Sequence, residues 1–312
     1  MKGQHVAEIL VMATMDCEPV RSMIPESRRD ISRSGPADWQ ASERSIRGYT
    51  GLCAAYGWPL TLFVHPEVAA EHRSLLRELE QRGCCLGLHL HPYKLAAGDY
   101  RLDLGAYAAS VQRRMIAAAA ASWRRQIGHA PRYFRGGYFS ANDMTFGVLE
   151  RLGFEGGSLS IPGRVLPDHQ SVWAGSAAYP HAADTAFRLC SGTSAFVEVP
   201  VSVDYERPVA RGAAGEIGYE WPYLAAESYD FRAVADDIVE RFARDAPPIA
   251  VLVTDVHNDQ DLSDLGHPAA RNLRVVFDAV LDRAAARDLT VKGATLEGVC
   301  RAHRQLSRRV RR

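Results

Sequence analysis

Short apolar runs alternate with helical patterns along almost the whole chain, and this alternation limits the folds open to it. Residues 9–15, 60–64 and 248–254 form apolar runs of the length and composition of buried strands. Between such runs lie segments such as 67–82, which has a helical pattern and is closed by Gly83. Strands that alternate with helices indicate a parallel sheet, either open and doubly wound or closed into a barrel.

The other expected elements continue this alternation. Helices are expected over 42–56, 107–126, 143–152 and 231–244, and again over 273–287, and strands over 84–90, 131–135 and 196–202. Residues 19–40 are expected to form a surface loop, and 156–194, rich in Gly, Ser, Pro and His, an extended loop or an insertion. We therefore expect a single catalytic domain over 1–305 and a basic C-terminal tail over 306–312.

The bulk composition narrows the class of protein. With 37 basic and 37 acidic residues the net charge is zero, so no overall field favours nucleic acid or an anionic membrane. Six scattered cysteines without a CxxC pair indicate reduced thiols rather than a disulfide framework. No apolar run reaches the roughly 20 residues that span a bilayer, and the first residues lack the apolar core of a signal peptide. We expect a cytoplasmic protein without a membrane span; the sequence does not indicate its oligomeric state.

Four of the expected strands end in ionisable residues. These ends are Asp16-Cys17-Glu18, His89-Leu90-His91, Arg135, and Asp255-Val256-His257. In parallel α/β folds the catalytic side chains lie at the carboxyl ends of the strands. One polar strand end is commonly a structural hydrogen bonder, but four of them predict a ring of functional groups around one mouth.

His89 and His91 are the most specific of these residues. Side chains at i and i+2 of a strand point to the same face, so both imidazoles can bind one metal ion. Imidazole is the commonest protein ligand for zinc and similar ions. A hydrogen-bonding histidine pair near the mouth is the alternative, and the metal site needs a further, acidic ligand.

The ordered set of strand ends resembles the motifs of the polysaccharide deacetylase family, carbohydrate esterases of the NodB-homology type. Thr14-Met15-Asp16-Cys17-Glu18 is similar to the family's Thr-Phe-Asp-Asp motif, and Gly87-Leu88-His89-Leu90-His91 to its two-histidine motif. Arg135-Gly136-Gly137-Tyr138 is similar to its Arg-x-Pro-Tyr motif, and Val253-Thr254-Asp255-Val256-His257 to its last, histidine-bearing motif. The order matches from about residue 9 to 300. Cys17 departs from the family's second Asp, and the Asp16-x-Glu18 form with His89-x-His91 resembles a divergent branch.

The resemblance implies a fold and a chemistry. The fold is an irregular (β/α) barrel of about seven strands. The activity is removal of an N-acyl group, most often acetyl, from an amino sugar by metal-activated water, with Zn²⁺ as the expected ion. Glu18 is the expected third ligand beside His89 and His91, with Asp16 and Cys17 as alternatives.

The resemblance also implies roles for the remaining strand ends. Asp16 would be the general base, and Arg135 would hold it ionised. The backbone N–H of Tyr138 would stabilise the oxyanion, and His257 would protonate the leaving amine. The competing structural roles are a turn cap for Asp16, a surface ion pair for Arg135 and a polar-loop residue for His257.

Two other functions compete with a metal-dependent deacetylase. One is a different C–N hydrolase on the same fold, such as a deformylase or an allantoinase-like enzyme that needs no metal. The other is a catalytically inactive, carbohydrate-binding relative, because the Asp-Asp motif is broken at Cys17. A cytoplasmic location favours a small, nucleotide-linked or lipid-linked N-acylated sugar over a cell-wall polymer.

Overall fold

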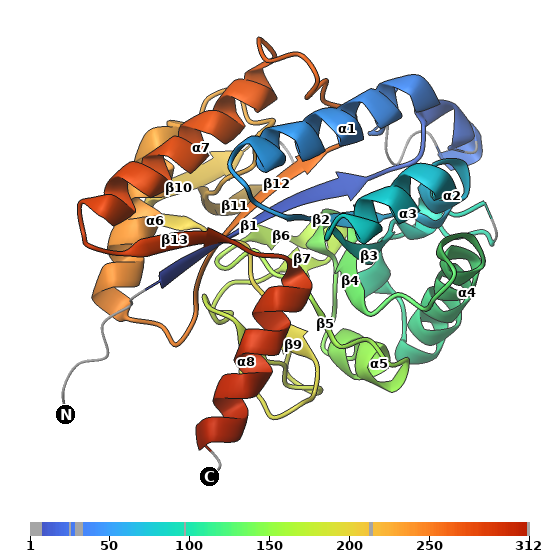
Figure 1. The fold of residues 1–312 in the computed structure, drawn as a ribbon. Coiled ribbons are helices and arrows are strands. Elements are labelled where there is room, and N and C mark those ends of the chain that lie inside the picture. Colours follow the sequence, from blue (N-terminus) through green and yellow to red (C-terminus); the bar gives the residue numbers. More distant parts are fainter. Residues whose placement is uncertain (1–7, 25, 29–33, 97, 212–214, 311–312) are drawn as a thin grey trace.

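A computed structural model describes residues 8–24, 26–28, 34–96, 98–211 and 215–310. Within these ranges one sheet has nine strands. Its order is β12 (Ala250–His257), β1 (Glu8–Cys17), β2 (Leu60–Val64), β3 (Cys85–Leu90), β4 (Tyr133–Gly136), β5 (Gly156–Gly157), β9 (Val197–Glu198) and β8 (His181–Ala182), and β13 (Thr290–Gly293) also pairs with β1. All neighbours run parallel except β8, which is antiparallel to β9. The sheet curls into an incomplete, irregular (β/α) barrel, so the fold that the resemblance implies is confirmed, and the open doubly wound sheet is not formed (Figure 1).

Helices surround the outside of this sheet, except for the last one, which packs against its inner face (Figure 1). They are α1 (Trp39–Ala55), α2 (Pro66–Glu71), α3 (Arg73–Gln81), α4 (Ala109–Ile127), α5 (Thr145–Arg151), α6 (Phe231–Asp245), α7 (Pro268–Ala285) and α8 (Leu296–Val310). Short 3₁₀ helices span Arg21–Met23, Glu26–Arg28, Pro92–Lys94, Leu104–Ala106, Gly137–Phe139 and Pro167–His169. The helix expected over 107–126 is α4, which ends at Ile127; Gly128 follows it with a φ of +107°, a conformation that favours glycine.

Several elements differ from those expected. The helix expected over 67–82 is broken at His72 into α2 and α3; the His72 ring turns inward and lies 3.0 Å from the hydroxyl of Ser42. The strand expected over 196–202 pairs in the ladder only through β9. Residues 306–310, expected to belong to a frayed tail, continue α8, and residues 311–312 lie outside the described residues.

A second sheet is formed by residues for which no strands were expected. It has four strands in the described chain, in the order β10 (Asp204–Arg211), β11 (Glu216–Glu220), β6 (Val165–Leu166) and β7 (Ser171–Val172). The pairing of β10 with β11 is antiparallel, with a register shift between Asp204 and Pro208. The irregular segment 156–194 is therefore partly an insertion that builds this sheet.

The two faces of the barrel sheet bury two separate apolar clusters. Along each strand the side chains alternate, so that Val11, Ala13 and Met15 of β1 pack outward against the helices while Met12 packs inward. The inner cluster also contains Phe63, Cys85, Tyr133 and Val253 from neighbouring strands, together with Leu296, Val299 and Cys300 of α8. The last helix therefore fills part of the barrel interior.

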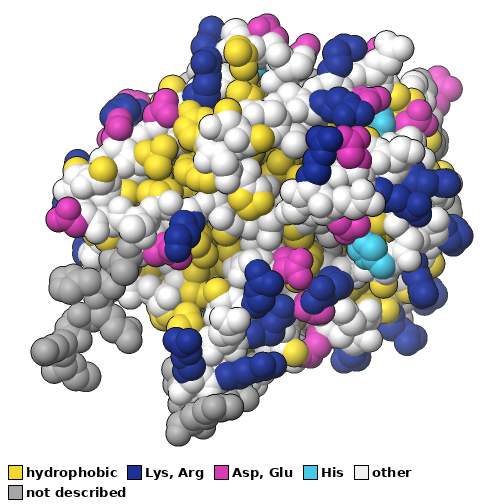
Figure 2. Space-filling view, in the orientation of Figure 1, with side chains coloured by type: hydrophobic (Ala, Val, Ile, Leu, Met, Phe, Trp, Pro, Cys, Tyr) yellow, Lys and Arg dark blue, Asp and Glu magenta, His cyan; other side chains and the backbone are white. Residues whose placement is uncertain are grey.

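The surface agrees with the balanced charge of the sequence. Figure 2 shows basic and acidic side chains interspersed over the visible face, with apolar patches between them. No described helix is long and apolar enough to cross a bilayer.

Candidate functional site

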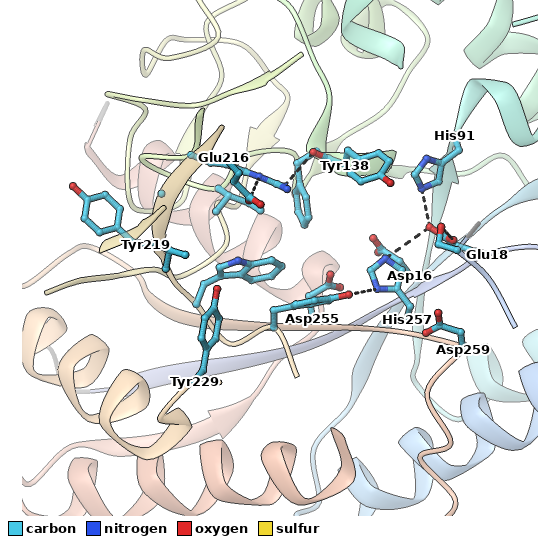
Figure 3. A pocket seen from close by; sticks show the side chains of 18 residues that line it. Asp16, Glu18, His91, Tyr138, Glu216, Tyr219, Tyr229, Asp255, His257 and Asp259 are labelled. Carbon is cyan, nitrogen blue, oxygen red and sulfur yellow. Dashed lines mark hydrogen bonds and ion pairs between the residues drawn. The ribbon is translucent and has the colours of Figure 1, made fainter. Parts of the chain in front are cut away.

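The inner face of the barrel changes from apolar to polar at the carboxyl ends of its strands. Residues two apart on a strand share a face, so the inward positions continue from Met12 to Thr14 and Asp16, from Cys85 to Gly87 and His89, from Tyr133 to Arg135, and from Val253 to Asp255 and His257. The four polar strand ends recognised in the sequence therefore converge at one mouth of the barrel (Figure 3).

Arg135 joins two buried carboxylates at this mouth. Its Nη1 lies 3.0 Å from Oδ1 of Asp16 and 2.6 Å from Oδ1 of Asp255, and the side chain is fully buried. Burial raises the pKa of Asp255 to about 7, and the neighbouring charge of Asp16 adds to this rise. Asp255 belongs to one of the polar strand ends noted in the sequence, but no role in this clamp was predicted for it. Its place two residues before His257, on the same strand face, was the available signal.

The carboxylate of Glu18 is shared between histidines and a lysine. Its Oε1 lies 2.7 Å from Nε2 of His91 and 3.8 Å from Nε2 of His89. Its Oε2 accepts hydrogen bonds from Nζ of Lys94 at 2.5 Å and from Oγ of Ser34 at 2.8 Å. Burial opposes ionisation of Glu18, but Lys94 and His91 outweigh it and hold the pKa of this carboxyl well below its usual range. Burial also holds the pKa of His91 well below its usual range, so the ring is neutral and able to act as a ligand.

Two groups of side chains have the geometry of a metal site: Glu18 with His89 and His91, and Asp16 with Asp255 and His257. Both ring nitrogens of His89 are buried without a hydrogen-bond partner among the described residues. Such orphaned nitrogens are rare in proteins, and an ion bound by Nε2, which lies 3.8 Å from Oε1 of Glu18, would satisfy one of them. The first group therefore fits a divalent metal. The second group already holds the guanidinium of Arg135 between its carboxylates, so it does not need a second cation.

Cys17 and Asp16, the alternatives for the third metal ligand, are less well placed than Glu18. Cys17 lies on the outer face of β1, buried in the apolar cluster beneath the helices, and burial raises the pKa of its thiol well above the usual value. Asp16 lies on the inner face but its Oδ1 accepts from Arg135, and its Oδ2 is 3.8 Å from Nδ1 of His89. The geometry therefore favours Glu18 as the acidic ligand.

His257 lies beside these groups with a partly exposed ring. Asp16 and His257 are partners in the ladder between β1 and β12, and Nε2 of His257 is 3.7 Å from Oε1 of Glu18. Burial lowers the pKa of His257, but the charges of Glu18, Asp255, Asp16 and Asp259 outweigh it and raise the pKa above the usual value. A protonated ring at this place suits a proton donor.

Tyr138 is held in an unusual backbone conformation. Its φ is +54° and that of Phe139 is +57°, a region in which side chains other than glycine are strained. Gly137 precedes them, and a Cβ there would lie 2.1 Å from the ring of His91, so only glycine fits. The Tyr138 ring stacks on His169 at 3.8 Å, and Nδ1 of His169 lies 2.7 Å from Asp103. The surrounding contacts thus maintain a conformation that the residue alone would avoid.

The converging groups line a pocket of about 280 Å³. Figure 3 shows Glu18, His91 and Asp259 at one end of the pocket, and Glu216 and Tyr219 of the second sheet at the other. Ser34, Ile161, Val209 and Trp221 also line it. The rings of Trp221 and Tyr223 stack at 5.1 Å. The second sheet therefore walls the pocket opposite the polar strand ends.

Arg164 connects the second sheet with Tyr138. Its Nε lies 3.0 Å from Oε1 of Glu216, and its Nη1 donates to the carbonyl oxygen of Tyr138 at 3.3 Å. No role was predicted from the sequence for Arg164, Glu216 or Lys94. Their partners are distant in the chain, so neither spacing nor periodicity pointed to them.

Comparison with known proteins agrees with the fold. Residues 42–157 match the sequence model of the family described as polysaccharide deacetylase. A putative polysaccharide deacetylase from Mycobacterium smegmatis superposes with a TM-score of 0.61 at 16% identity, over 98% of this chain and 93% of that one. A putative glycoside hydrolase/deacetylase from Parabacteroides distasonis gives 0.68 at 12% identity, over 97% and 72%. The allantoinase Puue gives 0.56 at 13% identity, over 97% and 91%. No curated protein matches the chain significantly.

Proposed function

We propose that this chain, whose residues 42–157 match the sequence model of the polysaccharide deacetylase family, is a metal-dependent hydrolase that removes an N-acyl group from an amino sugar. The observation that carries the proposal is the pairing of Asp16 with His257 on adjacent strands, next to the Glu18–His89–His91 group. A proton acceptor and a proton donor then flank the place where the scissile amide would lie.

Amide hydrolysis requires a proton to leave the attacking water and a proton to reach the departing nitrogen. Asp16, held by Arg135, accepts the first as general base. The water oxygen bonds to the acyl carbon, and the negative charge that develops on the acyl oxygen is stabilised by the backbone N–H of Tyr138. His257 donates its proton to the nitrogen as the C–N bond breaks, so the products are a carboxylic acid and a free amine. The raised pKa of His257 keeps the donor protonated near neutral pH.

Glu18, His89 and His91 would hold the metal ion, and Zn²⁺ is the expected one for a site of two imidazoles and one carboxylate. When bound, such an ion supplies a water of lowered pKa and polarises the acyl oxygen. The orphaned nitrogens of His89 support this assignment.

The shape of the pocket supports a compact substrate. A cavity of about 280 Å³ lies at the lower end of the range of ligand sites and has a wall formed by the second sheet. The stacked rings of Trp221 and Tyr223, with Tyr138 also lining the pocket, offer apolar faces for a sugar ring. We expect a small or terminal N-acylated sugar rather than the interior of a polymer. The cytoplasmic location expected from the sequence stays a prediction.

The test is release of primary amine from N-acetylglucosamine, from its glycosides and from short chito-oligomers, with a matched set of N-formyl substrates. Turnover by the wild-type chain that is lost in Asp16→Asn would support the proposal. Elemental analysis of wild type and a His89→Ala/His91→Ala double variant checks the metal, and equal metal content in both would rule out the site. No release above background from any of these substrates would contradict the activity.

A metal-independent amidohydrolase is the second candidate, and the buried ammonium of Lys94 on Glu18 favours it. This cation already neutralises the carboxylate that would otherwise attract a metal. The two candidates differ in one measurement: turnover that survives prolonged dialysis against a chelator supports the second and contradicts the first.

A further inference from the structure

Lys94 is a buried cation that none of the expected catalytic roles uses. It ends the 3₁₀ helix Pro92–Lys94 directly after the two histidines, and only 2% of the residue is exposed. Lysine is almost never buried without a partner, because desolvation of its ammonium is costly. The partners of Lys94 therefore indicate what the charge is for.

The ammonium is directed at a single oxygen of Glu18. Nζ lies 2.5 Å from Oε2 of Glu18, and donates to Oγ and to the carbonyl oxygen of Ser34 at 2.7 and 3.1 Å. The same Ser34 hydroxyl lies 2.8 Å from Oε2 of Glu18. Lys94 and Ser34 thus occupy one side of the carboxylate.

The other oxygen of Glu18 faces the imidazoles. Oε1 lies 2.7 Å from Nε2 of His91, 3.8 Å from Nε2 of His89 and 3.7 Å from Nε2 of His257. Oε2 therefore lies next to the ammonium of Lys94, whereas Oε1 lies next to the imidazole rings. A carboxylate can bind a metal through one oxygen or through both, and here one oxygen is already engaged.

We propose that Lys94 restricts Glu18 to binding a metal ion through Oε1 alone and weakens the affinity of the site for that ion. The inference rests on the proposed function, since it takes Glu18, His89 and His91 as ligands. Two effects act in the same direction: Lys94 withdraws negative charge from the ligand, and its own charge repels a divalent cation across a few ångströms of poorly screened protein interior.

The weaker binding has a chemical consequence. A ligand whose charge is partly neutralised by hydrogen bonds donates less electron density, so the bound ion keeps more of its positive charge. Lys94 would therefore weaken the binding of the metal ion and make the bound ion a stronger electrophile. A metal site with the same three ligands and no lysine would bind more tightly.

The experiment measures Zn²⁺ affinity directly, by competition with a chromophoric chelator, on the full chain freed of metal. Lys94→Met keeps the length of the side chain and removes its charge. We expect its Kd for Zn²⁺ to fall at least tenfold relative to wild type. Ser34→Ala, which removes one donor from Oε2 and leaves the charge, is expected to lower Kd by a smaller factor. Lys292→Met is the control, because Lys292 is exposed and pairs with Glu8 far from the site; its Kd should equal that of wild type.

The outcomes separate this inference from the proposed function. An unchanged or higher Kd in Lys94→Met, with Zn²⁺ bound by wild type, overturns the inference and leaves the proposed function standing. Zn²⁺ bound by Lys94→Met but not by wild type supports the inference and contradicts metal-dependent catalysis by the wild-type chain. If Lys94→Met does not fold without metal, Ser34→Ala decides: a lower Kd supports the inference, and an unchanged or higher Kd overturns it.

Discussion

Asp16 of β1 and His257 of β12 lie directly opposite each other in a parallel ladder, at the point where both strands reach the mouth of the barrel. The side chains of both residues lie on the inner face. Asn258 continues the link past the last ladder pair, because its side-chain oxygen accepts from the backbone N–H of Glu18 at 2.8 Å and its amide donates to the Glu18 carbonyl at 3.0 Å. Strand pairing, extended by the side chain of Asn258, thus fixes the relative positions of Asp16, His257 and Glu18.

Replacing Arg135 by glutamine is expected to damage stability and catalysis together. The change leaves Asp16 and Asp255 buried side by side without a cation, and breaking a buried ion pair costs roughly 3–5 kcal/mol of unfolding free energy. We expect kcat to fall by at least about a hundredfold, because the base loses its orientation. Urea unfolding and steady-state kinetics measure the two effects.

Arg132→Gln serves as the control for this variant. Arg132 is half-exposed and pairs with Glu155 at the surface, so its loss should cost about 1 kcal/mol or less. An Arg135→Gln protein that unfolds within 1 kcal/mol of wild type would show that the two carboxylates do not need this cation.

The pH dependence of kcat is expected to follow the protonation of His257, whose pKa depends on the charges of the neighbouring carboxylates. Burial lowers the pKa of this ring, and four carboxylates, Asp259 among them, raise it above the usual value. The proton donor is present below that pKa, so kcat should fall as the pH rises through it. Asp259→Asn removes one of the raising charges and should move this alkaline limb to lower pH.

Asp261→Asn is the matched change for the pH profile, since Asp261 is exposed and bonds to Ser263. If the alkaline limb of the kcat profile does not shift in Asp259→Asn, or shifts equally in both variants, His257 is not the proton donor.

The contact between Arg164 and Glu216 is expected to act on catalysis through Tyr138. Glu216→Gln weakens the hold on Arg164, whose Nη1 bonds the carbonyl of the strained residue. Loss of one oxyanion donor costs about 10²–10³ in kcat, so a displaced donor should cost less, on the order of tenfold. Glu206→Gln, an exposed change on the same hairpin, should leave kcat unchanged. A change in KM alone would show that the pair contacts substrate and does not position Tyr138.

Glu198 is expected to make stability fall as the pH rises. Its Oε1 accepts from the N–H groups of Leu159 and Ser160, but burial raises its pKa to about 7, from a usual value of 4.5. The folded protein therefore binds this proton more tightly than the unfolded chain, and that stabilisation is present below the unfolded pKa and lost as the pH rises towards 7. The total is on the order of 3 kcal/mol.

Unfolding free energies at pH 5 and pH 7.5 test this prediction in wild type and Glu198→Gln. The wild type should lose more stability over this interval than the variant does. Equal losses would mean that Glu198 is ionised throughout.

The period-two pattern of the strands explains why the sequence predicted much of the site. Asp16 and His89 lie four positions after the inward-facing Met12 and Cys85, and Arg135 lies two positions after Tyr133. Even spacing keeps side chains on one face of a strand, so the strand ends could be placed on one face before any contact was known. The same pattern places Cys17 on the outer face, although the sequence left it open as a ligand.

The missed parts depend on contacts that no local pattern encodes. β10 contains Glu206, Arg207 and Pro208, a composition that does not suggest a strand, and its partner β11 pairs with it across a register shift. Lys94 resembles a surface residue in sequence, and its partners Ser34 and Glu18 lie 60 and 76 residues away. His72 breaks an otherwise continuous helix because its ring reaches Ser42, 30 residues earlier.

The pairing of β1 with strands from the end of the chain has a consequence for how the chain folds. The first strand pairs with β12 and β13, and the bond between Thr14 and Thr254 spans 240 residues. The inner apolar cluster is also incomplete until Leu296 and Cys300 of α8 have been synthesised. During synthesis β1 therefore emerges long before β12 and β13, although its other neighbour β2 follows early, and Asp16 cannot meet His257 until β12 has left the ribosome. Such distant pairing predicts slow, late assembly of the barrel mouth, with the exposed edge of β1 as the segment that chaperones would need to protect.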